Sequence, residues 1–98
     1  MDKGAVEQEL SSLPGVVFLE FRADWCGPCH VMDPMLHAME HEHKGKLTLK
    51  QIDVDQERAL AQEFGVMSIP ALFVYRDGKL EQQLLGLQTK QNLLRFLA

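Results

Sequence analysis

The chain has 98 residues, of which 46% are hydrophobic and 24% charged, and its formal net charge is −4. This length suits one hydrophobic core rather than two, so we expect a single domain over residues 1–98. The acidic balance, without a run of Lys or Arg, argues against nucleic acid as a partner, because phosphate binding needs a basic surface. No apolar run approaches the roughly 20 residues that cross a bilayer, so no membrane association is expected.

The first part of the chain predicts a short helix followed by a buried strand. Val6, Leu10 and Leu13 recur at helical spacing, and Pro14-Gly15 ends this helix. Residues 16–21 (VVFLEF) form a nearly continuous apolar run, which is typical of a strand covered on both faces. The chain then passes directly into the sequence Trp25-Cys26-Gly27-Pro28-Cys29.

A longer helix is expected over residues 26–41, where one face carries Val31, Met35, Leu36 and Met39. Pro34 lies inside it and should kink it, because proline lacks a backbone donor and crowds the preceding turn. Residues 47–54 predict a second strand. We expect Asp55 to cap a helix that runs to Phe64 and ends at Gly65.

The last third of the chain predicts a hairpin and a closing helix. Residues 71–75 (ALFVY) and 79–85 form its strands, joined by an Asp77-Gly78 turn. Gly86 ends the second strand, and Thr89 caps a helix whose buried face contains Leu93, Leu94, Phe96 and Leu97. The order α-β-α-β-α-β-β-α predicts an α/β fold, with a mixed sheet flanked by helices on both faces.

Two cysteines lie three positions apart where the first strand gives way to a helix. The backbone N–H groups and the dipole of a helix start stabilise thiolate over thiol, so Cys26 is expected to be the nucleophile. Cys29 lies one turn further in, where it is placed to attack the mixed disulfide that Cys26 forms. Gly27 leaves room for an incoming backbone, and Pro28 stiffens the turn. The pair therefore predicts thiol–disulfide exchange.

Residues 23–29 (ADWCGPC) resemble the active-site stretch of the thioredoxin family. The resemblance covers nearly the whole chain, through Pro34 in the long helix, Ile69-Pro70 before a strand, Asp77-Gly78 in the hairpin and Gly86 before the last helix. It implies a thioredoxin fold and a protein-disulfide reductase. Its Cys26–Cys29 couple would cycle between dithiol and disulfide, with no bound cofactor and no metal.

The same resemblance implies partners and a substrate site. The partners would be disulfide-containing client proteins and an NADPH-dependent flavoprotein reductase, and the protein would be a cytoplasmic monomer. The N-terminal residues agree with this, since they lack the basic flank and apolar stretch of a secretory signal. Pro70 would be a cis proline facing the two sulfurs, which would turn the Ile69 backbone toward an extended peptide. The shallow apolar rim around that peptide would be Trp25, Val66, Ile69, Pro70 and Gly86.

The chain also departs from the family pattern. Glu20 stands where the family usually has Asp, and it should assist proton transfer from Cys29 as a buried carboxyl with a raised pKa. Gln51 stands where a Lys is common, and strand alternation points the adjacent Lys50 to the other face. His30 replaces a Lys or Arg and would add positive charge only at lower pH.

The stretch before residue 16 is shorter than in the family. We therefore expect the N-terminal edge strand to be missing and the sheet to have four strands. One edge of that sheet would be more exposed to pairing with another chain.

Other interpretations use the same residues. Cys26–His30 also matches the C-x-x-C-H pattern of c-type haem attachment, although so short an α/β chain offers no apolar haem cavity. Zinc could join the cysteines to His37, His41 or His43, yet these histidines lie two or more turns further along, in a polar stretch typical of a solvated helix end. A redox-active scaffold, or a reductant dedicated to one client, would carry the same cysteines.

Overall fold

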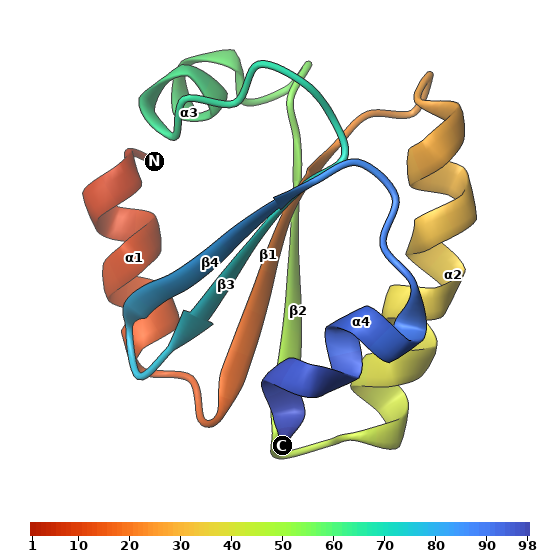
Figure 1. Cartoon of the computed structure of the whole chain (residues 1–98). Helices are drawn as coiled ribbons and strands as arrows, with labels where there is room; N and C mark the ends of the chain where they lie inside the picture. Colours follow the sequence, from red (N-terminus) through yellow and green to blue (C-terminus); the bar gives the residue numbers. More distant parts are fainter.

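The computed structural model describes residues 1–98, and its strands form one mixed sheet (Figure 1). The strands are β1 (Val16–Arg22), β2 (Leu47–Asp53), β3 (Ala71–Arg76) and β4 (Lys79–Leu85). Their order in the sheet is β2-β1-β3-β4, with β1 parallel to β2 and antiparallel to β3, and β4 antiparallel to β3. This is the four-stranded arrangement that the sequence predicts.

Helices cover both faces of this sheet. α1 (Lys3–Ser11) and α3 (Arg58–Glu63) lie on one side; α2 (Gly27–Glu42) and α4 (Lys90–Leu94), with the 3₁₀ turn Arg95–Leu97, lie on the other (Figure 1). The order of elements matches the predicted one, and Pro34 lies inside an uninterrupted α2. Every helix falls short of the length and apolar character that crossing a lipid bilayer requires.

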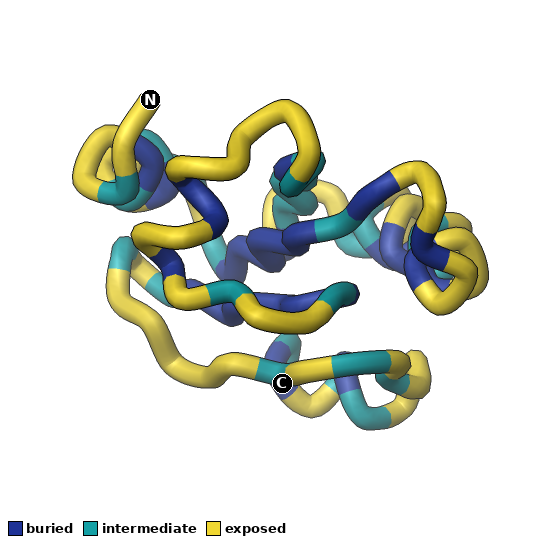
Figure 2. The backbone as a smooth tube through the Cα atoms, turned by 90° about the horizontal axis from the view of Figure 1, so that it is seen from above, coloured by how far each residue is buried: buried dark blue, intermediate teal, exposed yellow.

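Strand β1 is buried because its side chains alternate between two apolar layers. Val17, Leu19 and Phe21 join the cluster that includes residues of α1 and α3, whereas Val16 and Phe18 join the cluster formed with α2 and α4. Figure 2 shows the buried residues concentrated along the strands, between the helices. The even-numbered positions of β1 therefore face α2.

The structure contains the predicted turn between β3 and β4, the glycine after β4 and the cap of α4. Asp77 and Gly78 both have positive φ, 53° and 78°, as a type I′ hairpin turn requires. Gly86 follows β4 with φ 78°. The Thr89 side chain accepts a hydrogen bond of 3.0 Å from the Asn92 N–H, so it caps α4 as expected.

The prediction that Asp55 caps the third helix is wrong. α3 begins later, after Glu57, which makes no side-chain capping bond. Asp53 organises the intervening turn, because its Oδ1 accepts hydrogen bonds from the N–H groups of Asp55 and Gln56, at 2.8 and 3.3 Å. The Asp55 carboxylate instead accepts a bond from the indole of Trp25. A tertiary partner thus outweighs the local capping preference.

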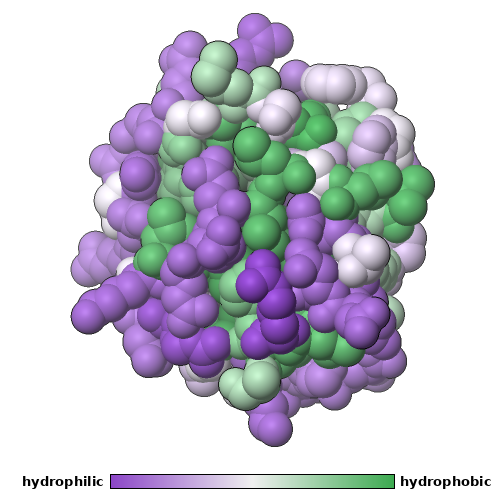
Figure 3. Space-filling view, in the orientation of Figure 1, coloured by the Kyte–Doolittle hydropathy of each residue, from purple (hydrophilic) through white to green (hydrophobic).

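Both edges of the sheet carry charged side chains, which discourage pairing with another chain. β4 is almost entirely exposed, and Lys79 and Glu81 lie along it. Lys50 of β2, the other edge strand, forms a 2.7 Å ion pair with Glu9 of α1. On the face seen in Figure 3, apolar side chains lie in patches separated by hydrophilic ones.

We expect Gly15→Ala to destabilise the fold more than Gly45→Ala. Both glycines have positive φ, 73° and 84°, so each alanine should cost about 1 kcal/mol in backbone strain. A Cβ at residue 15 would also press on the carbonyl of Lys46, whose oxygen accepts the bond that opens the β1–β2 pairing, whereas one at residue 45 meets nothing. Urea unfolding should show a loss of roughly 2 to 4 kcal/mol for Gly15→Ala. Equal losses in the two variants would contradict this role of Gly15.

Candidate active site

Cys26 and Cys29 form a disulfide at the N-terminus of α2, with Cα atoms 5.3 Å apart. Cys26 is the N-cap residue, and its Sγ accepts a hydrogen bond of 3.2 Å from the Cys29 N–H. Pro28 occupies the first turn, where a missing N–H leaves no bond unmade. A Cβ added at Gly27 would meet no atom within 4 Å, so the surface beside the disulfide is open. Cys26 Sγ therefore lies at the N-terminus of α2, where the helix dipole stabilises a negative charge.

The two cysteines differ in depth. Cys26 is 4% exposed and Cys29 is completely buried, and together with Ala23 they form a small apolar cluster. Val54 and Ile69 pack against this cluster from the segments that follow β2 and precede β3. A protein partner approaching from solvent would therefore reach Cys26 before Cys29.

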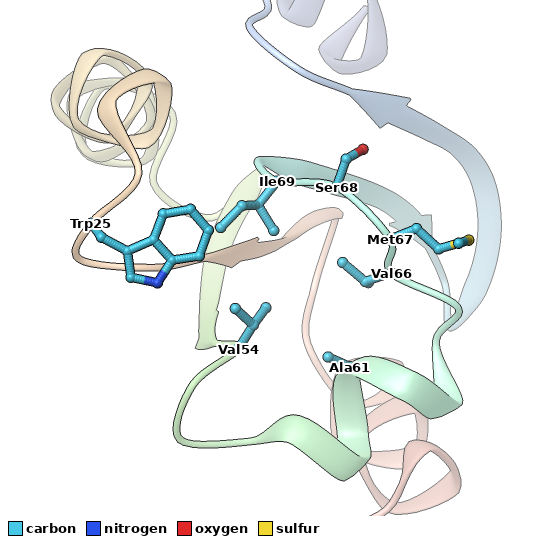
Figure 4. A pocket seen from close by; sticks show the side chains of 7 residues that line it. All are labelled: Trp25, Val54, Ala61, Val66, Met67, Ser68 and Ile69. Atoms are coloured by element: carbon cyan, nitrogen blue, oxygen red, sulfur yellow. The ribbon is translucent and has the colours of Figure 1, made fainter.

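An apolar groove lies next to Trp25, which immediately precedes Cys26. Its volume is about 340 Å³, and six of its seven lining residues are hydrophobic. Figure 4 shows the indole at one end and the segment before β3 along the other side. Trp25 is 69% exposed, and its indole is held by the 2.8 Å hydrogen bond that its Nε1 donates to Asp55. The lining residues are Trp25, Val54, Ala61, Val66, Met67, Ser68 and Ile69.

The structure brings together part of the substrate rim expected from sequence. Trp25, Val66 and Ile69 line the groove, but Pro70 and Gly86 do not. The Ile69–Pro70 peptide bond is cis, as the resemblance implies, and Pro70 is buried. The Gly86 N–H donates to the Pro70 carbonyl at 2.8 Å, so Gly86 holds the end of β4 against the cis peptide.

Glu20 lies on the face of β1 that packs against α2, and it is the one polar or charged residue that is buried. The Gln51 amide donates to Glu20 Oε1 at 2.8 Å across the β1–β2 register, as the sequence predicts. Lys50 points to the opposite face, toward Glu9. Burial is the main cause that raises the pKa of Glu20 to about 8; Asp33 raises it further, while the bond from Gln51 lowers it.

Sequence reasoning missed an ion-pair network beside Glu20. Arg22 Nε donates to Asp33 Oδ2 at 2.8 Å, and Arg22 Nη1 lies 3.0 Å from Asp24 and 3.9 Å from Asp53. The sequence spacing of Arg22 and Asp33 already indicated that both side chains lie near the site. Arg22 is two residues after Glu20 on a strand, and Asp33 is four residues after Cys29 on a helix, so each shares a face with a predicted site residue.

The histidines stay apart from the sulfur chemistry. His30 is exposed, and its ring bonds the Asp24 carbonyl. His37 and His41 line a polar hollow with Glu40 and Lys44 toward the end of α2. No group of three or more His, Cys, Asp or Glu side chains is arranged to hold a metal ion.

Comparison with known proteins gives consistent similarities. The family model described as Thioredoxin matches residues 1–98. A thioredoxin from Staphylococcus haemolyticus is 40% identical over 83 residues, which cover 85% of this chain and 80% of that protein. A thioredoxin from Staphylococcus aureus is 39% identical over the same span. Among solved structures, a mutant thioredoxin from Halobacterium salinarum superposes with a TM-score of 0.84 and 30% identity, covering 99% of this chain and 83% of that one.

We expect Glu20→Gln to remove a pH dependence of stability. The pKa of this carboxyl rises from the ordinary value of 4.5 to about 8 on folding, so the folded protein binds more protons between these values. The free energy of unfolding of the wild type should therefore fall as pH rises from about 5 to about 8. At pH 8 the variant should be the more stable protein by roughly 3 to 5 kcal/mol, and at pH 4 the two should be similar.

Urea unfolding across this pH range measures the difference. Glu57→Gln serves as the control, because Glu57 is exposed and its side chain makes no capping bond. Parallel curves for the wild type and Glu20→Gln would mean that Glu20 is not held protonated by its surroundings.

Proposed function

This chain belongs to the thioredoxin family, so it is a thiol–disulfide oxidoreductase that reduces protein disulfides through its Cys26–Cys29 couple, and we propose that Cys26 is the attacking cysteine. The observation that carries this assignment is the position of Cys26 as N-cap of α2. Its sulfur there already accepts a backbone N–H, and the helix dipole favours thiolate.

The reaction proceeds by two exchanges. In the first, the Cys26 thiolate attacks one sulfur of a client disulfide; the other client sulfur leaves as a thiolate, and a mixed disulfide forms. In the second, the Cys29 thiolate attacks Cys26 Sγ, which releases the second client sulfur and forms the Cys26–Cys29 bond. Two electrons pass to the client, and Cys29 gives up a proton.

Glu20 is the proposed acceptor of that proton. It lies in the layer between β1 and α2, the helix whose first turn carries Cys29. With a pKa of about 8, roughly a tenth of Glu20 is ionised at pH 7, so it can take a proton from Cys29 in one direction and return it in the other.

The client docks as an extended segment beside Trp25 and Ile69. The groove supplies apolar contact from Trp25, Val66 and Ile69. The backbone N–H and C=O of Ile69 make no hydrogen bond within the protein, so both remain available to pair with a client strand. Pro70 fixes this backbone, and Gly86, bonded to Pro70, borders it.

The remaining assignments follow from family membership. Residues 1–98 form a single domain, since the family model spans all of them. The oxidised couple is returned to the dithiol by an NADPH-dependent flavoprotein reductase, and no bound cofactor takes part. Gly27-Pro28 between the cysteines resembles the reducing members of the family, which supports a cytoplasmic location. We propose further that the protein acts as a monomer.

Single replacements of the two cysteines should separate their roles. Cys29→Ser should accumulate a mixed disulfide with a client such as insulin, because nothing resolves the bond to Cys26. Cys26→Ser should accumulate none. Both variants should lose more than 100-fold in turnover. Non-reducing electrophoresis and mass spectrometry detect the adduct. Trapping by the Cys26 variant instead would reverse the assignment.

The role of Glu20 should appear in the pH dependence of reduction. Glu20→Gln cannot accept a proton, so we expect slower resolution of the mixed disulfide, by about 10- to 100-fold, and loss of the rate change near pH 8. The rate of insulin reduction by the reduced protein between pH 6 and 9 measures this. Superimposable profiles for the wild type and the variant would refute the proton-transfer role.

A further inference from the structure

Two buried carboxylate oxygens stand without a hydrogen-bond partner, Glu20 Oε2 and Asp33 Oδ1, and no other buried side-chain oxygen or nitrogen does. The second oxygen of each carboxyl is occupied. Gln51 donates to Glu20 Oε1 at 2.8 Å, and Arg22 donates to Asp33 Oδ2 at 2.8 Å. An unpaired buried acceptor destabilises the fold, so two of them in one protein call for a physical explanation.

The two carboxyls come from opposite sides of the interface between β1 and α2. Glu20 projects from the even-numbered face of β1, and Asp33 lies on α2, one turn beyond Cys29. The negative charge of Asp33 raises the pKa of Glu20, so the two carboxyls are close enough to interact. Two ionised carboxylates in this position would repel each other and leave both oxygens bare. One proton between them satisfies both oxygens at once.

The surroundings decide which carboxyl keeps the proton. Arg22 contacts Asp33 directly, and the pair is largely shielded, with 15% and 16% of the two side chains exposed. Apart from Asp33, the neighbours of Glu20 are the neutral amide of Gln51 on β2, the apolar Leu72 on β3 and, two residues along its own strand, Arg22. The cation therefore stabilises the charge on Asp33 and leaves Glu20 as the protonated member.

We propose that Glu20 and Asp33 share one proton, donated by Glu20 Oε2 to Asp33 Oδ1, and that Asp33, fixed by Arg22, is the positioning residue that keeps Glu20 protonated in the resting protein. This shared proton does not depend on catalysis. Its effect on the rate of disulfide reduction rests on the proposed function, in which Glu20 accepts the proton of Cys29. In that reaction Asp33 sets the pH at which the acceptor becomes available.

Replacing Asp33 tests the sharing. Asp33→Asn removes the negative charge that opposes ionisation of Glu20, so the titration midpoint of the Glu20 carboxyl should fall by about one pH unit or more. Carbon-13 NMR of side-chain carboxyls in the oxidised protein reports this midpoint directly, with Glu20→Gln used to assign the signal. Asp33→Ala should shift the midpoint in the same direction. It replaces the Asn variant if that protein folds poorly, because alanine is a strong helix former.

Asp24→Asn is the matched control. Asp24 also pairs with Arg22, at 3.0 Å, but its side chain is 85% exposed and is not among the groups that act on Glu20. This variant removes one acidic partner of the same arginine and should leave the Glu20 midpoint unchanged. If the shift came only from disturbing Arg22, Asp33→Asn and Asp24→Asn would change the Glu20 midpoint equally.

The outcomes separate this proposal from the proposed function. An unchanged Glu20 midpoint in both Asp33 variants, or an equal shift in Asp24→Asn, would overturn the shared proton. A lower midpoint together with a pH profile of insulin reduction displaced by the same amount supports the sharing and the catalytic role of Glu20. A lower midpoint with an unmoved profile still supports the sharing, and it counts against Glu20 as the proton acceptor.

Discussion

Helix α2 docks on the even-numbered face of β1, and the features of the active site depend on this contact. Met32, Leu36 and Met39 pack into the same apolar cluster as Phe18, which fixes the helix along its length and around its axis. Its position along the strand brings the first turn, with both cysteines, to the end of β1. Its rotation turns Asp33 toward Glu20. One apolar interface thus positions a sulfur pair at the helix start and a carboxyl pair further along.

The buried carboxyl is a departure from what stability alone would select. An apolar side chain at residue 20 would continue the run of β1 and would need no partner, whereas a carboxyl there is retained only in its neutral form or at a cost in free energy. Such groups concentrate at functional sites, because a protonation equilibrium near neutral pH is useful to a reaction that moves protons. Glu20 fits this pattern, since its surroundings supply an amide and a fixed carboxylate rather than a cation in direct contact.

Much of this arrangement could be predicted from sequence, because it rests on local rules. Alternation along β1 and β2 placed Gln51 beside Glu20 and sent Lys50 to the other face, and the WCGPC stretch located the helix start. Spacing places Arg22 on the face of Glu20 and Asp33 on the face of Cys29, but it does not predict that the two side chains meet, since their contact depends on how α2 crosses β1. For Asp55 a local rule gave a wrong prediction. Aspartate is a good helix cap, but the indole of Trp25, 30 residues away in sequence, donates a hydrogen bond to its carboxylate instead.

The central claim is that α2 holds the Cys26 sulfur as a thiolate, with Cys29 protected behind it. Alkylation of the reduced protein by limiting iodoacetamide at pH 7, read by peptide mass spectrometry, tests it most directly, with the urea-unfolded chain as reference. Cys26 should react faster in the folded protein than in the unfolded one, while Cys29 stays unmodified. Equal reactivity of Cys26 in the two states, or earlier labelling of Cys29, would contradict the account.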